Sequence, residues 1–292
     1  MHIETFQELR AIKNLLILSL LQIQMASFNS ISYTNTRCSF VTDEILEKCS
    51  TLFNNNYGIW SEDAPLHSNN VLKAGARVRM GAKRLRELML FNDRCFLITA
   101  EVRPSDHDQP ELIGHTFCTS AKYNRLNGNA VWITQLVVNS SYRGRGVAGT
   151  LLSMAKNTVE DVVVTGLVSS HPYAIIALSN ACNRIPIDLK FIGNHAEDVI
   201  RTCSIPYLSN PQLIGSIFKT QSFSAVDKNQ QPVSLVKTDF FVDHKEILAI
   251  LKGIQQKWVL GPLLDGHEFV VVLPAVSVRH SRTSSSESSS HT

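Results

Sequence analysis

Residues 132–156 read WITQLVVNSSYRGRGVAGTLLSMAK, and this stretch decides the fold of the chain. A run of strand-like apolar residues gives way to a short polar connection, and apolar residues then recur at helical spacing. Gly144 and Gly146 lie where the new helix begins, so the backbone can come close to a ligand that a Cβ would hold away. The unpaired N–H groups and the positive dipole end of that helix point at the same place. Arg143 and Arg145 add charge, so the stretch predicts a cradle for a phosphate-bearing ligand.

The glycine spacing also matches, in form, the G-x-G-x-x-G fingerprint of dinucleotide-binding folds, through Gly144, Gly146 and Gly149. In those folds the first glycine directly follows the strand, whereas residues 139–143 intervene here. The next expected strand, residues 162–170, ends in two serines rather than in the acidic residue that would bind a ribose hydroxyl. A dinucleotide-binding protein is therefore the weaker alternative.

The spacing Arg143-x-x-Gly146-x-Ala148 resembles the pyrophosphate-binding loop of the GCN5-related N-acetyltransferase (GNAT) superfamily. The strand before the loop and the Leu151-Leu152 pair in the helix after it extend the resemblance. In that family, backbone N–H groups of the loop bind the pyrophosphate arm of acetyl-CoA. The residues that the resemblance assigns to acetyl-CoA binding are Leu136, Val137, Val138, Arg143, Gly144, Arg145, Gly146, Val147, Ala148 and Gly149.

The resemblance implies an acyl-CoA N-acyltransferase fold of the α/β (α+β) class. Its sheet is mixed and mostly antiparallel, with a splayed parallel pair of strands at the centre and helices on both faces. A strand–helix–strand unit surrounds the cradle and hairpin-like runs precede it, in agreement with that order. Strands are expected over residues 95–102, 112–120, 131–138, 162–170, 234–242 and 269–273. Helices are expected over residues 43–53, 77–90, 172–182, 188–202 and 245–254, besides the one that follows the cradle.

The chain divides into one folded domain and two terminal segments. Residues 28–275 are the GNAT-like acyltransferase domain, with an enlarged insertion at about residues 183–232, and this region resembles fungal GNAT-like proteins of unassigned substrate. Residues 1–27 are an N-terminal extension, whose apolar run is shorter than the roughly 20 residues of a membrane-spanning helix. Residues 276–292 are Ser-rich and are expected to be disordered.

The composition is that of an ordinary globular protein, since 44% of the residues are hydrophobic and 18% are charged. A net charge of +3, spread along the chain, gives no reason to expect a nucleic-acid partner. The six cysteines form no C-x-x-C pair, which argues against a zinc site and for reduced thiols in the cytoplasm or the nucleus. We therefore expect no metal, no nucleic acid and no membrane association, and the oligomeric state stays open.

The catalytic groups are expected where the second parallel strand ends, at Ser170, His171 and Tyr173. His171 could take the proton of an amine, and Tyr173 or Ser170 could protonate the departing thiolate. The family often carries a tyrosine acid further along this helix, but Leu178 stands at that position. Glu62, in the loop after the first helix, is the alternative base.

The expected function is that of an N-acetyltransferase, which moves an acetyl or other acyl group from acetyl-CoA to an amine by direct attack in a ternary complex. The acceptor is a small-molecule or peptide amine that the sequence does not name. An alkyl ammonium has a reference pKa of about 10.4, so a base or a desolvating pocket must remove its proton. The missing family tyrosine keeps a second class open, a CoA-binding module without catalytic activity.

Overall fold

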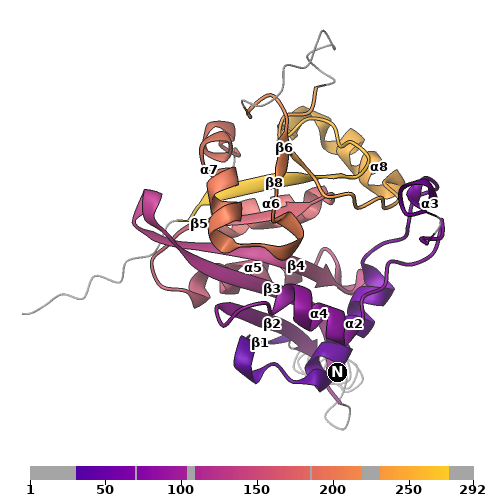
Figure 1. Cartoon of the computed structure of the whole chain (residues 1–292). Helices are drawn as coiled ribbons and strands as arrows, with labels where there is room; N and C mark the ends of the chain where they lie inside the picture. Colours follow the sequence, from indigo (N-terminus) through magenta and orange to yellow (C-terminus); the bar gives the residue numbers. More distant parts are fainter. Residues whose placement is uncertain (1–30, 70, 104–108, 185, 219–230, 276–292) are drawn as a thin grey trace, which may run out of the picture.

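One mixed sheet of eight strands organises the chain (Figure 1). The computed structural model describes residues 31–69, 71–103, 109–184, 186–218 and 231–275. The strands are β1 (Ile31–Arg37), β2 (Cys95–Val102), β3 (Glu111–Tyr123), β4 (Gly128–Val138), β5 (Val162–Ser169), β6 (Gln212–Ile214), β7 (Leu235–Lys237) and β8 (His267–Pro274). Their order across the sheet is β1-β2-β3-β4-β5-β8-β7-β6.

The helices start at the signals that the sequence provides. They are α2 (Asp43–Asn56), α3 (Ala64–His67), α4 (Ala82–Met89), α5 (Val147–Thr158), α6 (Pro172–Ala181), α7 (Leu189–Cys203) and α8 (Lys245–Ile254). Thr42 is the N-cap of α2 and accepts the N–H of Ile45 at 3.3 Å. Asp188 caps α7 in the same way, through the N–H of Phe191. Pro172 occupies the first turn of α6, where its missing N–H costs nothing.

The centre of the sheet carries the parallel pairing that the sequence predicts. β4 and β5 run parallel, and the other neighbouring strands pair antiparallel. α5 joins β4 to β5, because a parallel pair needs a long crossover connection. The expected mixed and mostly antiparallel sheet is therefore confirmed.

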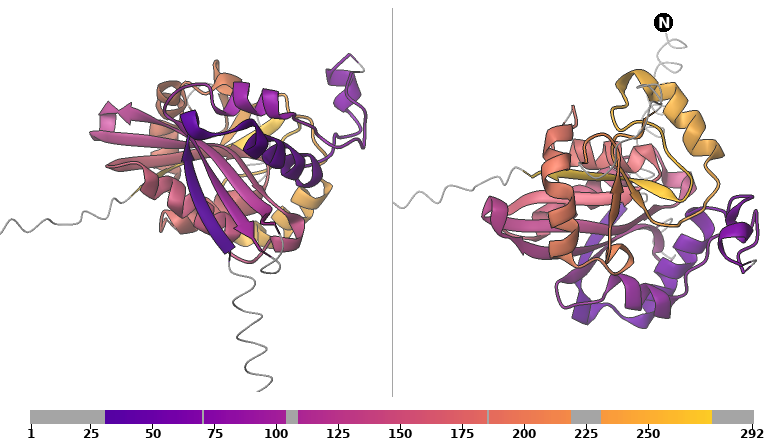
Figure 2. Two further views of the ribbon diagram at one scale, coloured as in Figure 1. Left: turned by 90° about the horizontal axis from the view of Figure 1, so that it is seen from below. Right: turned by 45° about the horizontal axis from the view of Figure 1, so that its top comes forward.

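Helices cover both faces of this sheet (Figure 2). On one face, Phe53 of α2 and Leu85 of α4 pack with Phe117 of β3. α7 lies beside them, against β3, β4 and β8. On the other face, Leu151 of α5 packs with Ile98 of β2, and α6 packs against α5. The expected helices on both faces are confirmed, and the cradle lies at the edge of the α5 layer.

The predicted helix over residues 77–90 begins only at Ala82. The reason is that the residues before it are held extended, since the N–H of Val78 bonds to the carbonyl of Gly58 at 3.0 Å. Gly81 then caps the helix with an extended conformation. The predicted range was wrong by one and a half turns at its start.

The predicted strand over residues 234–242 is confined to β7. Asp239 adopts a left-handed φ of 54°, which no strand accommodates, so the chain turns away there. Two edge strands, β1 and β6, were not predicted at all. They lengthen the sheet at its two ends and leave its centre as expected.

Several predictions concern residues outside the described ranges. These are the N-terminal extension over residues 1–27, the tail over residues 276–292, and residues 219–230 of the insertion. The described part of the insertion contains α7, as predicted, and adds β6 to the edge of the sheet.

Candidate functional site

The predicted cradle lies at the start of α5 and is open. Gly146 is the N-cap of α5 with a φ of 81°, and Gly144 has a φ of 75°, so both adopt the left-handed conformation that glycine tolerates. A Cβ added at Gly144, Gly146 or Gly149 would meet no atom within 4 Å. The space above the loop is therefore free for a ligand.

The backbone of this loop presents a row of free donors. In the described part of the chain, the six consecutive N–H groups from Gly144 to Gly149 have no intramolecular hydrogen-bond partner. The first bond of the helix is donated by Thr150 to the carbonyl of Gly146 at 3.0 Å. The helix dipole adds partial positive charge at the same end. Such an array matches the oxygens of a phosphate or pyrophosphate.

A β-bulge opens the sheet beside the cradle. The register of β3 with β4 skips Thr134, which is therefore an extra residue in β4. The parallel pairing of β4 with β5 ends at Ile133 and Leu167. Beyond this point β4 runs on to Val138, while β5 continues along β8. The two parallel strands therefore diverge toward the cradle, and we call the space between them the gap.

The N–H groups of Leu136 and Val138 face this gap. Asn139 donates its N–H to the carbonyl of Ile113 in β3, at 2.8 Å, and successive N–H groups of a strand alternate between its two edges. Val137 therefore bonds toward β3, and its two neighbours face the side that β5 has left. Their N–H groups can donate to the oxygen of a carbonyl that enters the gap.

Tyr207 reaches the gap from the insertion. It lies in the 3-10 turn η4 (Pro206–Leu208), and its hydroxyl donates a hydrogen bond of 3.0 Å to the carbonyl of Thr134. Burial raises the pKa of this hydroxyl, the indole N–H of Trp132 lowers it, and the charge of Glu268 raises it further. The indole N–H lies near the hydroxyl but outside hydrogen-bonding geometry. At neutral pH the hydroxyl is protonated and can donate.

Glu268 lies next to the end of β5. β8 pairs Phe269 with Ser169, so Glu268 lies beside Ser170, just beyond the last residue of that strand. The glutamate is only 8% exposed. Burial raises its pKa to about 7, whereas the hydroxyl of Thr238 and the backbone N–H of Ser170 lower it. Near neutral pH this carboxyl is therefore divided between its charged and neutral forms.

The three predicted catalytic residues lie at the same strand end. The Nδ1 atom of His171 accepts the N–H of Tyr173 at 3.3 Å and so caps α6, which leaves Nε2 for other partners. Burial lowers the pKa of His171, the charge of Arg143 lowers it further, and Glu246 raises it. Tyr173 is 54% exposed, whereas Ser170 is buried. Their catalytic roles stay predictions.

Three aromatic side chains form a wall, Tyr57, Trp60 and Phe240, of which Tyr57 lies near Glu268. The ring of Phe240 lies 5.8 Å from that of Tyr57 and 5.3 Å from that of Trp60. Burial of the Tyr57 hydroxyl raises its pKa, and the charges of Glu268 and Tyr207 raise it further. Yet 38% of Tyr57 is exposed to solvent. The aromatic wall therefore reaches the surface of the protein at Tyr57.

Three further charged residues were predicted from the sequence to belong to the site. Glu62 is solvent-exposed, and its carboxylate forms an ion pair with Lys245 at 3.2 Å. Arg143 donates to the carbonyl of Asn56 at 2.8 Å, which ties the cradle loop to the end of α2. The guanidinium of Arg145 lies 5.1 Å from the ring centre of Tyr142. Both arginines flank the cradle and leave its donors uncovered.

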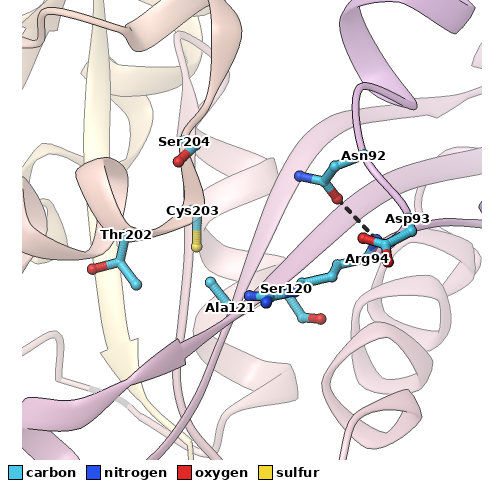
Figure 3. A pocket seen from close by; sticks show the side chains of 8 residues that line it. All are labelled: Asn92, Asp93, Arg94, Ser120, Ala121, Thr202, Cys203 and Ser204. Atoms are coloured by element: carbon cyan, nitrogen blue, oxygen red, sulfur yellow. Dashed lines mark hydrogen bonds between the residues drawn. The ribbon is translucent and has the colours of Figure 1, made fainter.

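A cavity of about 260 Å³ lies elsewhere, between the turn after α4 and the end of α7 (Figure 3). Its lining residues are Asn92, Asp93, Arg94, Ser120, Ala121, Thr202, Cys203 and Ser204. Ser120 is six residues along β3 from Gly114, the residue that packs against Val147 at the start of α5. That separation is roughly 20 Å, so the cavity is distinct from the cradle.

Sequence reasoning missed Tyr207 and Glu268. Tyr207 follows a proline in a stretch without periodicity, and Glu268 stands at the start of an apolar strand, where an acidic residue is usually solvated. Tyr207 is identified by its hydrogen bond to Thr134, and Glu268 by the pairing of Phe269 with Ser169. Both are contacts between residues far apart in the sequence. Among the residues described, no group of three or more metal-binding side chains comes together, and no helix is long and apolar enough to cross a membrane.

Solved structures of acetyltransferases resemble part of the chain. Arylalkylamine N-acetyltransferase 2 from Aedes aegypti is 12% identical, with a TM-score of 0.36 over 52% of this chain and 82% of its own. A possible acetyltransferase from Clostridium difficile 630 is 17% identical, with a TM-score of 0.35 over 54% and 92% of the two chains. The NatC complex bound to Gag peptide and CoA contains a chain that is 16% identical, with a TM-score of 0.33 over 51% and 80%.

No protein-family model matches the chain, and no curated protein is similar to it in sequence. Because the TM-scores are below 0.5, the assignment of the fold rests on this chain's own strand order, its bulge and its cradle. The mixed sheet with its central parallel pair and the cradle at the start of α5 agree with the fold that the resemblance of the loop to the GNAT superfamily implies.

Proposed function

We propose that the protein is an acyl-CoA-dependent N-acyltransferase, which transfers an acetyl or other acyl group to a small-molecule or peptide amine. The observation that carries this proposal is the row of six free N–H groups at the start of α5, beside a gap between parallel strands. The row suits the pyrophosphate of CoA, and the gap suits the narrow pantetheine arm that follows it. Acetyl-CoA is then a co-substrate bound by backbone donors.

The gap also offers the groups that acyl transfer requires. The N–H groups of Leu136 and Val138 would polarise the thioester carbonyl, and such donors typically contribute about 2.7–4 kcal/mol of transition-state stabilisation. Holding the thioester and the amine in line removes much of the entropic cost of their encounter. The hydroxyl of Tyr207, which lies at the bulge beside the gap, would donate a proton to the departing thiolate. Ser170 and Tyr173 stay candidates for the same role.

The first prediction concerns the choice of cofactor. We expect CoA and acetyl-CoA to bind at least about tenfold more tightly than NAD, a difference of about 1.4 kcal/mol. The physical reason is that the cradle provides phosphate donors, while β5 ends at Ser169 and lacks the acidic residue that would bind a ribose hydroxyl. Isothermal titration calorimetry measures both affinities. Tighter binding of NAD than of CoA would rule out the proposed function.

The second prediction concerns the leaving group. Tyr207→Phe should lower kcat about tenfold or more, which corresponds to about 1.4 kcal/mol, and should leave CoA affinity nearly unchanged. The measurement is thiol release from acetyl-CoA with a panel of primary amines. Tyr123→Phe is the matched control, because it removes a hydroxyl that bonds to His195 at 2.7 Å at the far end of β3. An unchanged kcat in Tyr207→Phe would return the role to Tyr173 or Ser170.

The same panel separates the enzyme from its alternative. A chain that binds CoA and releases thiol with none of the amines is a CoA-binding module without catalytic activity. The replacement of the family's tyrosine by Leu178, which is fully buried, is the observation in favour of that alternative. The hydroxyl of Tyr207 at the gap is the observation against it.

A further inference from the structure

One buried acid has no structural role that the fold requires. Glu268 lies at the start of β8, next to Val236 of β7 on one side and to Ser170 on the other. Among the described residues no cation forms an ion pair with its carboxylate. A strand would be more stable with an apolar residue at a position that is only 8% exposed. Its position calls for a functional explanation.

The groups that face this carboxylate come from every element around it. The hydroxyl of Thr238, after β7, and the backbone N–H of Ser170, after β5, lie close enough to lower its pKa, although the hydroxyl is outside hydrogen-bonding geometry. Tyr207, from the insertion, and Tyr57, from the end of α2, lie close enough for its charge to raise the pKa values of their hydroxyls. Each of these groups is neutral at physiological pH, so no neighbouring charge fixes the state of Glu268.

Glu268 therefore lies between the gap, where the thioester would bind, and the side of the protein where Tyr57 is exposed. On one side, Tyr207 bonds to the carbonyl of Thr134 and marks the gap, where the thioester would lie. On the other side, Tyr57 lies close enough to Glu268 for the two charges to interact, and this tyrosine is partly exposed to solvent. Aromatic faces attract ammonium groups, which suits the charged form of an amine acceptor.

We propose that the Glu268 carboxylate is the base that takes the proton from the ammonium group of the acceptor. The inference rests on the proposed function, since it names the base of that same reaction. It places the base on β8, opposite the predicted cluster of Ser170, His171 and Tyr173, and away from the exposed Glu62. The substrate class that follows is a primary amine.

The proton and electron balance of the step is complete. The ammonium gives one proton to the carboxylate, which leaves a neutral amine and a carboxylic acid. The nitrogen lone pair forms a bond to the thioester carbon, and the carbon–sulfur bond breaks with its electron pair on sulfur. The nitrogen then loses its second proton to solvent, and the thiolate takes the proton of the Tyr207 hydroxyl, which regains one from solvent. The carboxylic acid returns its proton to solvent, and the products are an amide and the free thiol of CoA.

The test compares Glu268→Gln with the wild type in acetyl-CoA thiol release between pH 5.5 and 9. The acceptor probes are phenethylamine, butylamine and a short peptide with a free α-amine. We expect Glu268→Gln to lower kcat about 100-fold, within the range of general-base catalysis, and to leave CoA affinity within about twofold. The rate of the wild type should fall as pH drops below about 7, because the base must be charged, and this limb should vanish in the variant.

Further variants keep the result specific. Glu268→Asp retains a carboxyl, so it should keep the acid limb at a lower rate. Glu197→Gln, which removes an exposed charge from the far part of α7, is the matched control and should keep the wild-type rate. The assignment would be overturned if Glu268→Gln kept the wild-type kcat while His171→Ala or Glu62→Gln lowered it. The base would then be the residue whose substitution lowered kcat.

Two outcomes distinguish the failure of this inference from the failure of the proposed function. If the wild type binds CoA and releases no thiol with any probe above the protein-free rate, the base assignment is overturned and the cradle stands. If CoA does not bind at all, the proposed function itself fails and the base assignment falls with it.

Discussion

Gly146→Glu should weaken the binding of CoA at least about 100-fold while the chain stays folded. The added side chain would enter the free space above the loop, where a Cβ meets nothing within 4 Å, and would bring a carboxylate to a row of phosphate donors. The carboxylate would itself accept from those N–H groups and would repel the pyrophosphate. A loss of 100-fold corresponds to about 2.7 kcal/mol, which the removal of two or three charge-assisted hydrogen bonds supplies.

Two control variants separate the possible causes of this loss. Gly146 has a positive φ, so any other residue there costs about 1–2 kcal/mol of folding stability, and Gly146→Ala measures that strain without a charge. Gly253→Glu adds the same charge to an exposed position of α8 with open space around it. Calorimetry with CoA and thermal unfolding are run on all three. If folded Gly146→Glu binds CoA as tightly as Gly146→Ala does, the loop does not hold the pyrophosphate.

Glu268→Gln should be more stable than the wild type at pH 8, by about 3 kcal/mol. The pKa of Glu268 is raised from an ordinary value of 4.5 to about 7, and each pKa unit corresponds to about 1.4 kcal/mol. Between these two values the folded chain keeps a proton that the unfolded chain has lost, so stability falls as pH rises through this window. Glutamine carries no charge at any pH and does not incur this cost.

Urea unfolding at pH 4.5, 6 and 8 measures the effect. The stability difference between Glu268→Gln and the wild type should be near zero at pH 4.5 and should reach its full size above pH 7. Tyr57 and Tyr207 do not disturb the comparison, because their raised pKa values keep both hydroxyls neutral throughout. Glu197→Gln provides a baseline without such a pH dependence. A variant less stable than the wild type at pH 8 would mean that the charged carboxylate is a stabilising part of the fold.

Together, the two experiments on Glu268 test whether the same carboxylate lowers the stability of the fold and raises kcat. A residue that weakens the fold when charged, and that the reaction needs in its charged form, is typical of catalytic positions. A gain in stability together with a loss of kcat in the same variant is the combined signature that a purely structural acid would not show.

The sequence predicted the centre of the fold because the signals there are local. The glycines at 144 and 146, the helical spacing of Leu151 and Leu152, and the apolar run before them lie within one short stretch. The strand, the turn and the helix are each specified by residues close together in the sequence. A helix that joins two neighbouring strands returns the chain to the same end of the sheet, so the two strands run parallel. The positive φ values of Gly144 and Gly146 show that the glycines are required where the sequence places them.

The edges of the sheet and the two buried site residues could not be predicted in the same way. β1 and β6 gain their hydrogen bonds from neighbours far along the chain, so their own residues carry a weak signal. From the sequence alone, Glu268 is expected to be a solvated acid. Only the pairing of Phe269 with Ser169 in the structure places it beside the end of β5. The bulge at Thr134 leaves no mark in composition, although it determines where the two parallel strands diverge.

The bond between Tyr207 and Thr134 has a consequence for how this chain can change in evolution. Surface connections usually accept insertions and deletions, because their length is independent of the core. Between α7 and β6 this freedom is lost, since a residue added before Tyr207 would move its hydroxyl away from the bulge. Related chains that keep this tyrosine should therefore keep the spacing from Cys203 to Tyr207.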